Sequence, residues 1–304
     1  MHAHSHVLDA RRGDNRRRMW VALVVNAGML GVEVVGGVLT GSLAVLADAG
    51  HLLSDVGSIG LGLFAATLAS RPAAGRMTFG YQRSEILAAL VNGLLLVGVS
   101  VAIAIAAVGR LGDPPSVDGL GVLVLGLLGL FGNAAAAAVL ARGDRVDVNL
   151  EGVLRHSAAD AAGSLGVILA GAVVLAGGPS AVDPIVSLLI AALILASSWR
   201  LIAEPLEVLM EAAPAGVDVE AAGAAICEED GVRSVHDLHI WTVTSGFGAL
   251  SAHVVVATDG DRDLVRRRIE LLLRERFDIG HTTLQMEEEA SDELLHVENA
   301  ASQG

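Results

Sequence analysis

Residues 19–203 alternate long apolar stretches with short polar connections. Each stretch is close to or above the roughly 20 residues that cross a bilayer as a helix. The pattern therefore predicts a membrane α-helical bundle of six transmembrane helices. They lie at about residues 19–39, 44–69, 84–109, 118–141, 157–178 and 182–203. The first two are joined only by "LTGS", which predicts a tight antiparallel pair.

Beyond Glu204 the pattern changes to shorter segments. Residues 217–229 and 261–276 have helical spacing. "VRSVHDLHIWTVTSG" and "ALSAHVVVATD" alternate like strands, with "GFG" as the turn between them, and "GHTTLQMEEE" is a third strand. The order α-β-β-α-β predicts a small α+β domain of ferredoxin-like, metallochaperone-like type, with its helices on one face of the sheet.

These patterns divide the chain into four parts. They are an N-terminal arm (1–18), the six-helix transmembrane domain (19–203), the α+β domain (204–290) and an acidic tail (291–304). The tail is expected to be disordered, because it has little to bury.

Arginines indicate the orientation of the bundle. Six spans place both termini on one side, and that side receives twelve arginines while the other receives only Arg110. The twelve are Arg11, Arg12, Arg16, Arg17, Arg18, Arg71, Arg76, Arg83, Arg142, Arg145, Arg155 and Arg200. Because positive loops stay inside, both termini are expected in the cytoplasm and the protein in the inner (plasma) membrane.

Composition supports this division. The chain is 53% hydrophobic, far above a typical soluble domain, and its net charge of −14 is concentrated after Glu204, with 21 acidic residues against 7 arginines. Cys227 is the only cysteine. A disulfide within the chain and a thiolate zinc cluster are therefore excluded. The polar, Arg-rich first twenty residues do not resemble a cleavable signal peptide.

Two predicted spans carry matching polar pairs. His51 and Asp55 are four residues apart in the second span, and His156 and Asp160 repeat that spacing in the fifth. A spacing of four puts both members on one helix face. Each pair lies in the first half of its span, and the two spans run in opposite directions. The pairs are therefore expected at similar depth in the membrane.

Two imidazoles and two carboxylates match a tetrahedral zinc site. Unpaired carboxylates are costly in hydrocarbon, and a divalent cation or protonation offsets that cost. Small residues around the pairs would let the helices approach closely. The alternative is a buried hydrogen-bonded pair that only holds two helices together. Asp48 stays open as a fifth ligand, a proton acceptor or a helix-start residue, and Glu33 is a candidate proton relay.

The chain resembles the cation diffusion facilitator family over nearly its full length. The resemblance is carried by "GSLAVLADAGHLLSD" (41–55), "FGYQRSEILAALVNG" (79–93), "HSAADAAGSLGVI" (156–168) and "VHDLHIW" (235–241). It implies a homodimeric exporter of divalent metals, commonly in exchange for protons. It also implies that His51, Asp55, His156 and Asp160 form the transport site, with zinc as the substrate because His51 occupies the first position.

The leading hypothesis is therefore Zn²⁺/H⁺ antiport by alternating access. Transport of Co²⁺, Cd²⁺ or Ni²⁺ is the alternative within this fold, because ligand type discriminates weakly. A membrane-anchored metal sensor needs no intramembrane site. An enzyme is not expected, because four ligands fill the tetrahedron and no separate general base or nucleophile is visible. No nucleic-acid partner is expected.

The α+β domain offers a second candidate site. His236 and His253 fall on neighbouring predicted strands, and Glu287 lies near the end of the third. The resemblance implies regulatory metal sites in this domain, often near the dimer interface. These histidines are equally compatible with surface or core positions, so a regulatory zinc site and ordinary packing both stay open.

Overall fold

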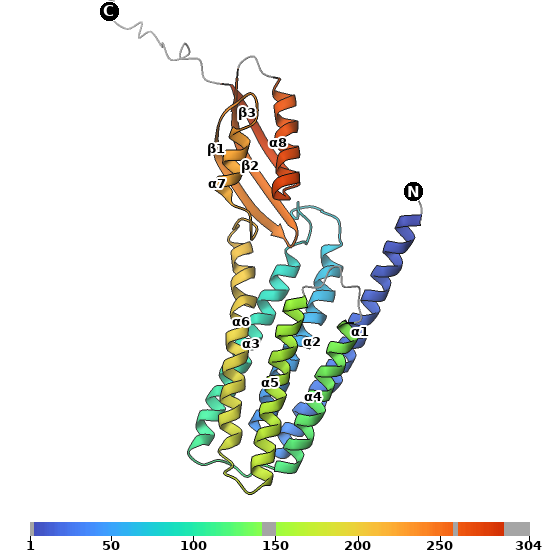
Figure 1. The fold of residues 1–304 in the computed structure, drawn as a ribbon, viewed down its shortest axis with the longest axis vertical. Coiled ribbons are helices and arrows are strands. Elements are labelled where there is room, and N and C mark those ends of the chain that lie inside the picture. Colours follow the sequence, from blue (N-terminus) through green and yellow to red (C-terminus); the bar gives the residue numbers. More distant parts are fainter. Residues whose placement is uncertain (1–2, 142–149, 258–260, 289–304) are drawn as a thin grey trace, which may run out of the picture. The chain divides into compact units, whose positions relative to one another are not determined.

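The computed structural model describes residues 3–141, 150–257 and 261–288, without the side chains of residues 3–19, 21–22, 136–141 and 150–159. The chain forms two compact units, Met1–Pro205 and Leu206–Gly304 (Figure 1). The first is helical and the second is an α+β unit.

Long helices build the first unit. They are α1 (Ala3–Thr40), α2 (Leu43–Ala69), α3 (Ser84–Leu111), α4 (Gly119–Ala141), α5 (Leu150–Leu175) and α6 (Val182–Leu209). Each overlaps one predicted span. The helix α1 begins at Ala3, so most of the segment predicted as an arm is helical. The helix α5 begins at Leu150 instead of residue 157, which places His156 in its second turn. The predicted acidic tail lies outside the described residues.

The surface of this unit is suited to lipid. Four of the described helical segments are long and apolar enough to cross a membrane: Leu23–Thr40, α2, α3 and α6. The described parts of α4 and α5 are shorter apolar helices. Large apolar side chains point outward, among them Val24, Leu39, Phe64, Ile105, Phe131, Leu169 and Leu189. Polar side chains are buried instead, among them Asn26, Glu33, Asp48, Asn92, Asp160 and Asp183.

The helix α2 lies at the centre of the bundle, where it packs against α1, α3, α4 and α5. Asn92 on α3 donates to Ser54 and Ser58 on α2, at 3.3 and 2.8 Å. Glycines allow the closest contact, between α4 and α5: a Cβ at Gly171 would lie 2.5 Å from the backbone nitrogen of Leu123. Small residues at such crossings let transmembrane helices approach.

Asp183, at the start of α6, holds the N-terminus of α2. Its carboxylate accepts hydrogen bonds from the Leu43 and Ala44 backbone nitrogens, at 2.8 and 3.3 Å, and from the Ser42 hydroxyl at 2.5 Å. Ser42 in turn caps α2 by accepting from Val45 N. The first backbone N–H groups of a helix lack partners within it, so a carboxylate there supplies acceptors and a favourable charge.

The second unit has the predicted order of elements. It contains α7 (Val219–Cys227), β1 (Val232–Thr244), β2 (Phe247–Val256), α8 (Arg262–Phe277) and β3 (His281–Glu288). The sheet order is β1-β2-β3, with β1 and β2 antiparallel and β2 and β3 parallel. The parallel pairing requires a crossover between β2 and β3, and α8 provides it.

Both helices cover one face of this sheet. Apolar residues of α7 and α8, including Ile226, Ile269 and Leu273, form one core with alternate strand residues such as Leu250 and Val254. The other face carries the intervening residues of β2 and β3. Any polar cluster that the strands build together is therefore expected on that uncovered face.

The turn between β1 and β2 differs from the prediction of "GFG". Thr244 pairs with Phe247, so the loop is only Ser245 and Gly246. Gly246 adopts a positive φ of 72°, which glycine takes without a steric penalty. Phe247 therefore belongs to β2, where its ring meets the His281 ring edge-on at 5.5 Å.

Candidate metal sites

The intramembrane site is built on α2 and α5, which pack against each other. His51 and Asp55 lie one turn apart on α2, and Asp160 lies on α5. His51 Nε2 and Asp160 Oδ1 are hydrogen-bonded at 2.5 Å. One potential ligand atom from each of His51, Asp55 and Asp160 lies within 4.8 Å of the other two. The structure thus brings together three of the four residues of the predicted site.

The hydrogen bond between His51 and Asp160 has a chemical consequence. Tetrahedral zinc holds nitrogen and oxygen ligands at about 2.0–2.2 Å, so a metal ion needs both atoms without an intervening proton. When His51 Nε2 donates to Asp160, it carries the proton that a metal ion would replace. Metal binding at this position therefore requires that proton to leave Nε2, either to Nδ1 of the same ring or out of the pair.

His156 is placed only by its position on α5. It lies four residues before Asp160, which on a helix puts the two on the same face. Its side chain lies outside the described residues, so its part in the site stays a prediction. The helix that carries it is the one that presents Asp160 to His51.

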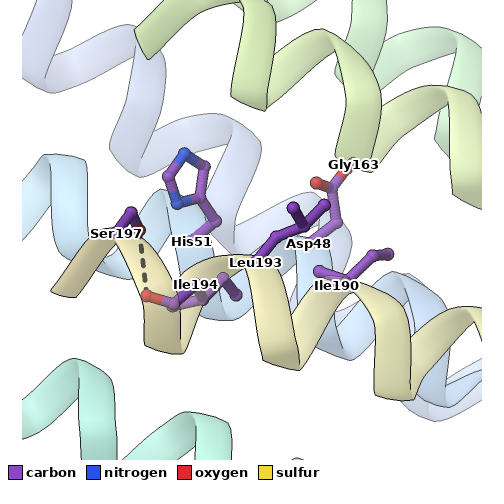
Figure 2. Close-up of a pocket in the computed structure, with 7 residues that line it drawn as sticks. All are labelled: Asp48, His51, Gly163, Ile190, Leu193, Ile194 and Ser197. Carbon is purple, nitrogen blue, oxygen red and sulfur yellow. Dashed lines mark hydrogen bonds between the residues drawn. The ribbon is translucent and has the colours of Figure 1, made fainter. Parts of the chain in front are cut away.

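A cavity opens beside His51. It is lined by Asp48, His51, Gly163, Ile190, Leu193, Ile194 and Ser197. Figure 2 shows Asp48 and His51 on α2 and Gly163 on α5, with the other four lining residues on α6. The α6 wall is uncharged. The polar side chains of the lining are Asp48 and His51 from α2 and Ser197 from α6.

A second cluster lies on the uncovered face of the sheet. His236 and His253 are directly paired on β1 and β2, with ring centroids 5.0 Å apart. Glu287 on β3 contacts both, at 3.1 Å to His236 Nε2 and 2.7 Å to His253 Nδ1. Hydrogen bonds from His236, His253 and Gln285 hold the pKa of the Glu287 carboxyl below its ordinary value. The three predicted residues therefore form one cluster that is able to hold a metal ion.

Asp237 extends this cluster through an irregularity in β1. The register between β1 and β2 shifts between His236 and His239, and Asp237 there adopts a positive φ of 52°. Its carboxylate lies 3.7 Å from His253 Nε2 and 3.0 Å from His239 Nε2. Backbone strain of this kind often marks functional sites. His281 lies apart from the cluster, against Phe247.

Comparison with known families matches both units. Residues 19–210 match the family described as "Cation efflux transmembrane domain", and residues 214–289 match "Cation efflux protein, cytoplasmic domain". The chain belongs to the cation efflux (cation diffusion facilitator) family. The resemblance noted in the sequence is confirmed, and this cation efflux protein is a multi-pass membrane protein.

Relatives of this cation efflux protein match over nearly the whole chain. The "Cadmium, cobalt and zinc/H(+)-K(+) antiporter" of Bacillus subtilis is 38% identical, over 91% of each chain. The "Zinc transporter ZitB" of Escherichia coli is 36% identical, over 94% of this chain and 92% of its own. The solved structure titled "Metal-bound C-terminal domain of the CzcD transporter from Cuprividus metallidurans" is 40% identical over 23% of this chain and 99% of its own, with a TM-score of 0.23.

Sequence reasoning missed two features of the cation efflux protein. Asp237 was not assigned to the cytoplasmic cluster, although it lies between His236 and His239 in sequence. Ser164, which donates to Asp48 across α5 and α2 at 3.1 Å, carried no signal of its own. The quoted motif "HSAADAAGSLGVI" does contain it, so a search for hydroxyls one turn beyond each carboxylate would have found it.

Proposed function

We propose that this cation efflux protein is a secondary active transporter that exports Zn²⁺ from the cytoplasm in exchange for protons. Family membership makes it a divalent metal cation efflux protein. The observation that carries the finer proposal is the convergence of His51, Asp55 and Asp160 from two packed helices. His156, one turn from Asp160, completes the proposed His₂Asp₂ transport site.

The coupling follows from the ligands. Zinc binds neutral imidazoles and ionised carboxylates, so its arrival displaces protons, and protons arriving from outside displace zinc. Alternating access requires the helices that carry the site to expose it first to one side and then to the other. The His51–Asp160 hydrogen bond is the arrangement that this pair adopts when a proton, and not a metal ion, lies between them.

The proposed membrane topology has six spans with both termini in the cytoplasm of an inner-membrane protein. The six helices of the first unit support the span count, since each overlaps one apolar stretch of the sequence. The excess of arginine on one side supports the orientation. The match of residues 214–289 to a family of cytoplasmic domains supports the same orientation.

Zinc is the preferred substrate in this proposal because its tetrahedral geometry suits two imidazoles and two carboxylates. The Bacillus subtilis relative is named for cadmium and cobalt as well as zinc. Cd²⁺, Co²⁺ and Ni²⁺ are therefore the alternative substrates. A membrane-anchored metal sensor is disfavoured, because such a protein has no use for carboxylates buried between α2 and α5.

The cytoplasmic cluster is proposed to be a regulatory zinc site. His236, His253 and Glu287 offer two imidazoles and a carboxylate on an uncovered sheet face, with Asp237 beside them. Zinc bound there would offset the acidic charge of this domain and favour its association in a homodimer. The site would thus respond to cytoplasmic zinc while the intramembrane site moves it.

Purified protein in liposomes tests the proposal. A zinc-sensitive dye inside the vesicles reports uptake, and an imposed pH gradient is switched on or off. Faster and concentrative uptake is expected when the interior is acidic, with matching alkalinisation of the lumen. Zinc uptake at the same rate with and without the pH gradient would contradict the antiport mechanism. The absence of any metal flux would favour the membrane-anchored sensor.

A further inference from the structure

Glu33 is a deeply buried acidic group that the transport mechanism leaves unused. It lies seven residues before the end of α1 at Thr40 and is 1% exposed. Among the residues that the structure describes, neither of its carboxylate oxygens has a hydrogen-bond partner. An ionised carboxylate without a donor is one of the costliest groups to bury. The group therefore needs a cation or a proton.

Oxygen atoms from three helices converge at this place. Gly129 on α4 has no side chain, and the point that its Cβ would occupy lies 2.8 Å from Glu33 Oε1, 3.3 Å from Ser164 Oγ and 3.4 Å from Asp48 Oδ2. A larger residue at 129 would force the Glu33 carboxylate to move. The glycine thus leaves room for a polar cluster between α1, α2 and α5.

Asp48 connects this cluster with the cavity of the transport site. Its Oδ2 accepts a hydrogen bond from Ser164, on the side of Glu33. The same residue lines the cavity that reaches His51. Asp48 thus lies between a buried acid on one side and the proposed metal position on the other. It is itself only 3% exposed.

Few other charged groups surround Glu33. The helices packed against α1 are α2 and α4. The described residues of α4 contain no charged side chain, and α2 contributes Asp48, His51 and Asp55. Asp160 on α5 lies one turn from Ser164. Among the side chains that the structure describes, no arginine forms a salt bridge with Glu33.

We propose that Glu33 and Asp48 form a proton-carrying pair, separate from the metal ligands, that couples metal movement to proton movement. This inference rests on the proposed antiport and deepens it. Two neighbouring carboxylates hold one proton readily, because it removes one buried charge and supplies a donor to the other. Asp48 exchanges that proton with water in the cavity, and Glu33 stores it away from the metal.

The pair responds to the metal through charge. A dication beside His51 and Asp160 repels the proton held near Asp48, which leaves through the cavity as the metal binds. When a proton returns to the pair, the nearby negative charge falls and the metal is held less tightly. One proton per cycle therefore passes through a group that does not touch the metal.

Proton release on zinc binding tests the proposal. Full-length protein in detergent is titrated with zinc in weakly buffered solution containing a pH dye, and protons released per bound zinc are counted. Glu33→Gln is expected to release about one proton fewer than wild type and to show weaker acceleration of liposome uptake by a pH gradient. Glu33→Asp keeps an acid and is expected to restore part of the release. Equal release by Glu33→Gln and wild type would overturn the proposal.

Several controls keep the outcome interpretable. Glu85→Gln makes the same change on α3, outside the cluster, and should release as many protons as wild type. If Glu33→Gln is folded but fails to bind zinc, Glu33 belongs to the metal site and the proposal is wrong. If Glu33→Gln does not fold, Asp48→Asn gives the deciding count, and release equal to that of wild type again overturns the pair.

Two further arms separate this inference from the proposed function and from another ligand. Wild-type protein that neither releases protons nor moves zinc contradicts the antiport itself, whereas coupled wild type with equally coupled Glu33→Gln contradicts only the pair. Uptake is also repeated with K⁺, Na⁺ or choline in the buffer. A Glu33→Gln defect confined to K⁺ or Na⁺ dependence, with normal proton release, would assign the cluster to a metal cation instead.

Discussion

The two histidine–carboxylate clusters use similar ligands in opposite surroundings. In the membrane, the side chains of His51 and Asp160 are only 15% and 11% exposed. In the cytoplasmic unit, His236 is 54% exposed and His253 and Glu287 are each 30% exposed. The first cluster joins two helices, whereas the second lies on one sheet whose strands are already joined by backbone hydrogen bonds.

This difference decides what each cluster is able to do. Water solvates the cytoplasmic cluster when it is empty, so it tolerates both the loaded and the unloaded state on a rigid sheet. The buried cluster lacks that solvation and needs a metal or protons at every stage. In the proposed mechanism, burial therefore couples metal to protons in the membrane, while exposure would permit simple reversible binding in the cytoplasm.

The largest expected effect of this difference between the buried and the exposed cluster is at Asp160. Asp160→Asn keeps the shape of the side chain and removes the charge that a metal needs. We expect zinc transport in liposomes to fall by at least about 100-fold, since loss of a direct ligand exceeds the effect of losing a supporting contact. Asp113→Asn makes the same change at an exposed position between α3 and α4 and should transport normally. Substantial transport by Asp160→Asn would contradict the proposed transport site.

The corresponding change in the cytoplasmic cluster should affect binding far more than movement. In an Asp160→Asn background, only the cytoplasmic site is left to bind zinc. Adding Glu287→Gln is expected to weaken that binding by about 10- to 100-fold, as measured by calorimetry on the full-length protein. Glu287→Gln alone should leave the intramembrane site able to transport. Unchanged zinc affinity in the double variant would refute the regulatory site.

The sequence predicts the frame of both clusters well. Apolar length locates the helices, and the repeated four-residue spacing predicts that His51 and Asp160 meet, because helix geometry converts spacing into a shared face. Strand alternation likewise predicts that His236, His253 and Glu287 gather. In each case the residues lie on regular elements, where sequence position fixes side-chain direction.

What the sequence does not predict depends on contacts between distant segments or on local irregularity. Asp183 reaches the N-terminus of α2 although 141 residues separate it from Ser42. Asp237 turns toward His253 only because β1 changes register there. The role of Gly129, which is to leave room for side chains from three other helices, is visible only once Glu33, Asp48 and Ser164 are placed around it. Spacing within one element contains none of this information.

Asp183 extends the comparison to a third kind of carboxylate. It is buried like Asp160, but it accepts three hydrogen bonds from Ser42, Leu43 and Ala44. Asp183→Asn leaves helix N–H groups poorly satisfied and is expected to lower stability by on the order of 2 kcal/mol. Thermal unfolding of the detergent-solubilised protein measures the change. Ser187→Ala, one turn further on α6, removes a buried hydroxyl bonded within its own helix and should cost about 1 kcal/mol or less. Equal effects would contradict a special role for Asp183.

The smallest expected effect is a pH dependence confined to the exposed cluster. The pKa of Glu287 is lowered in the folded protein from its ordinary value of 4.5 by hydrogen bonds from His236 and His253. A lowered folded pKa means that this stabilisation is complete above the ordinary value and is lost as the pH falls through the lowered one. The protection of β2 and β3 amides against hydrogen exchange, relative to an unfolded chain at the same pH, should therefore fall in the full-length, metal-free protein on acidification below about 4.5. Glu287→Gln should flatten this response while Glu288→Gln, the neighbour that pairs with Arg262, retains it. A response that survives Glu287→Gln would show that other carboxylates dominate, and the cytoplasmic cluster would then differ from its surroundings less than its hydrogen bonds imply.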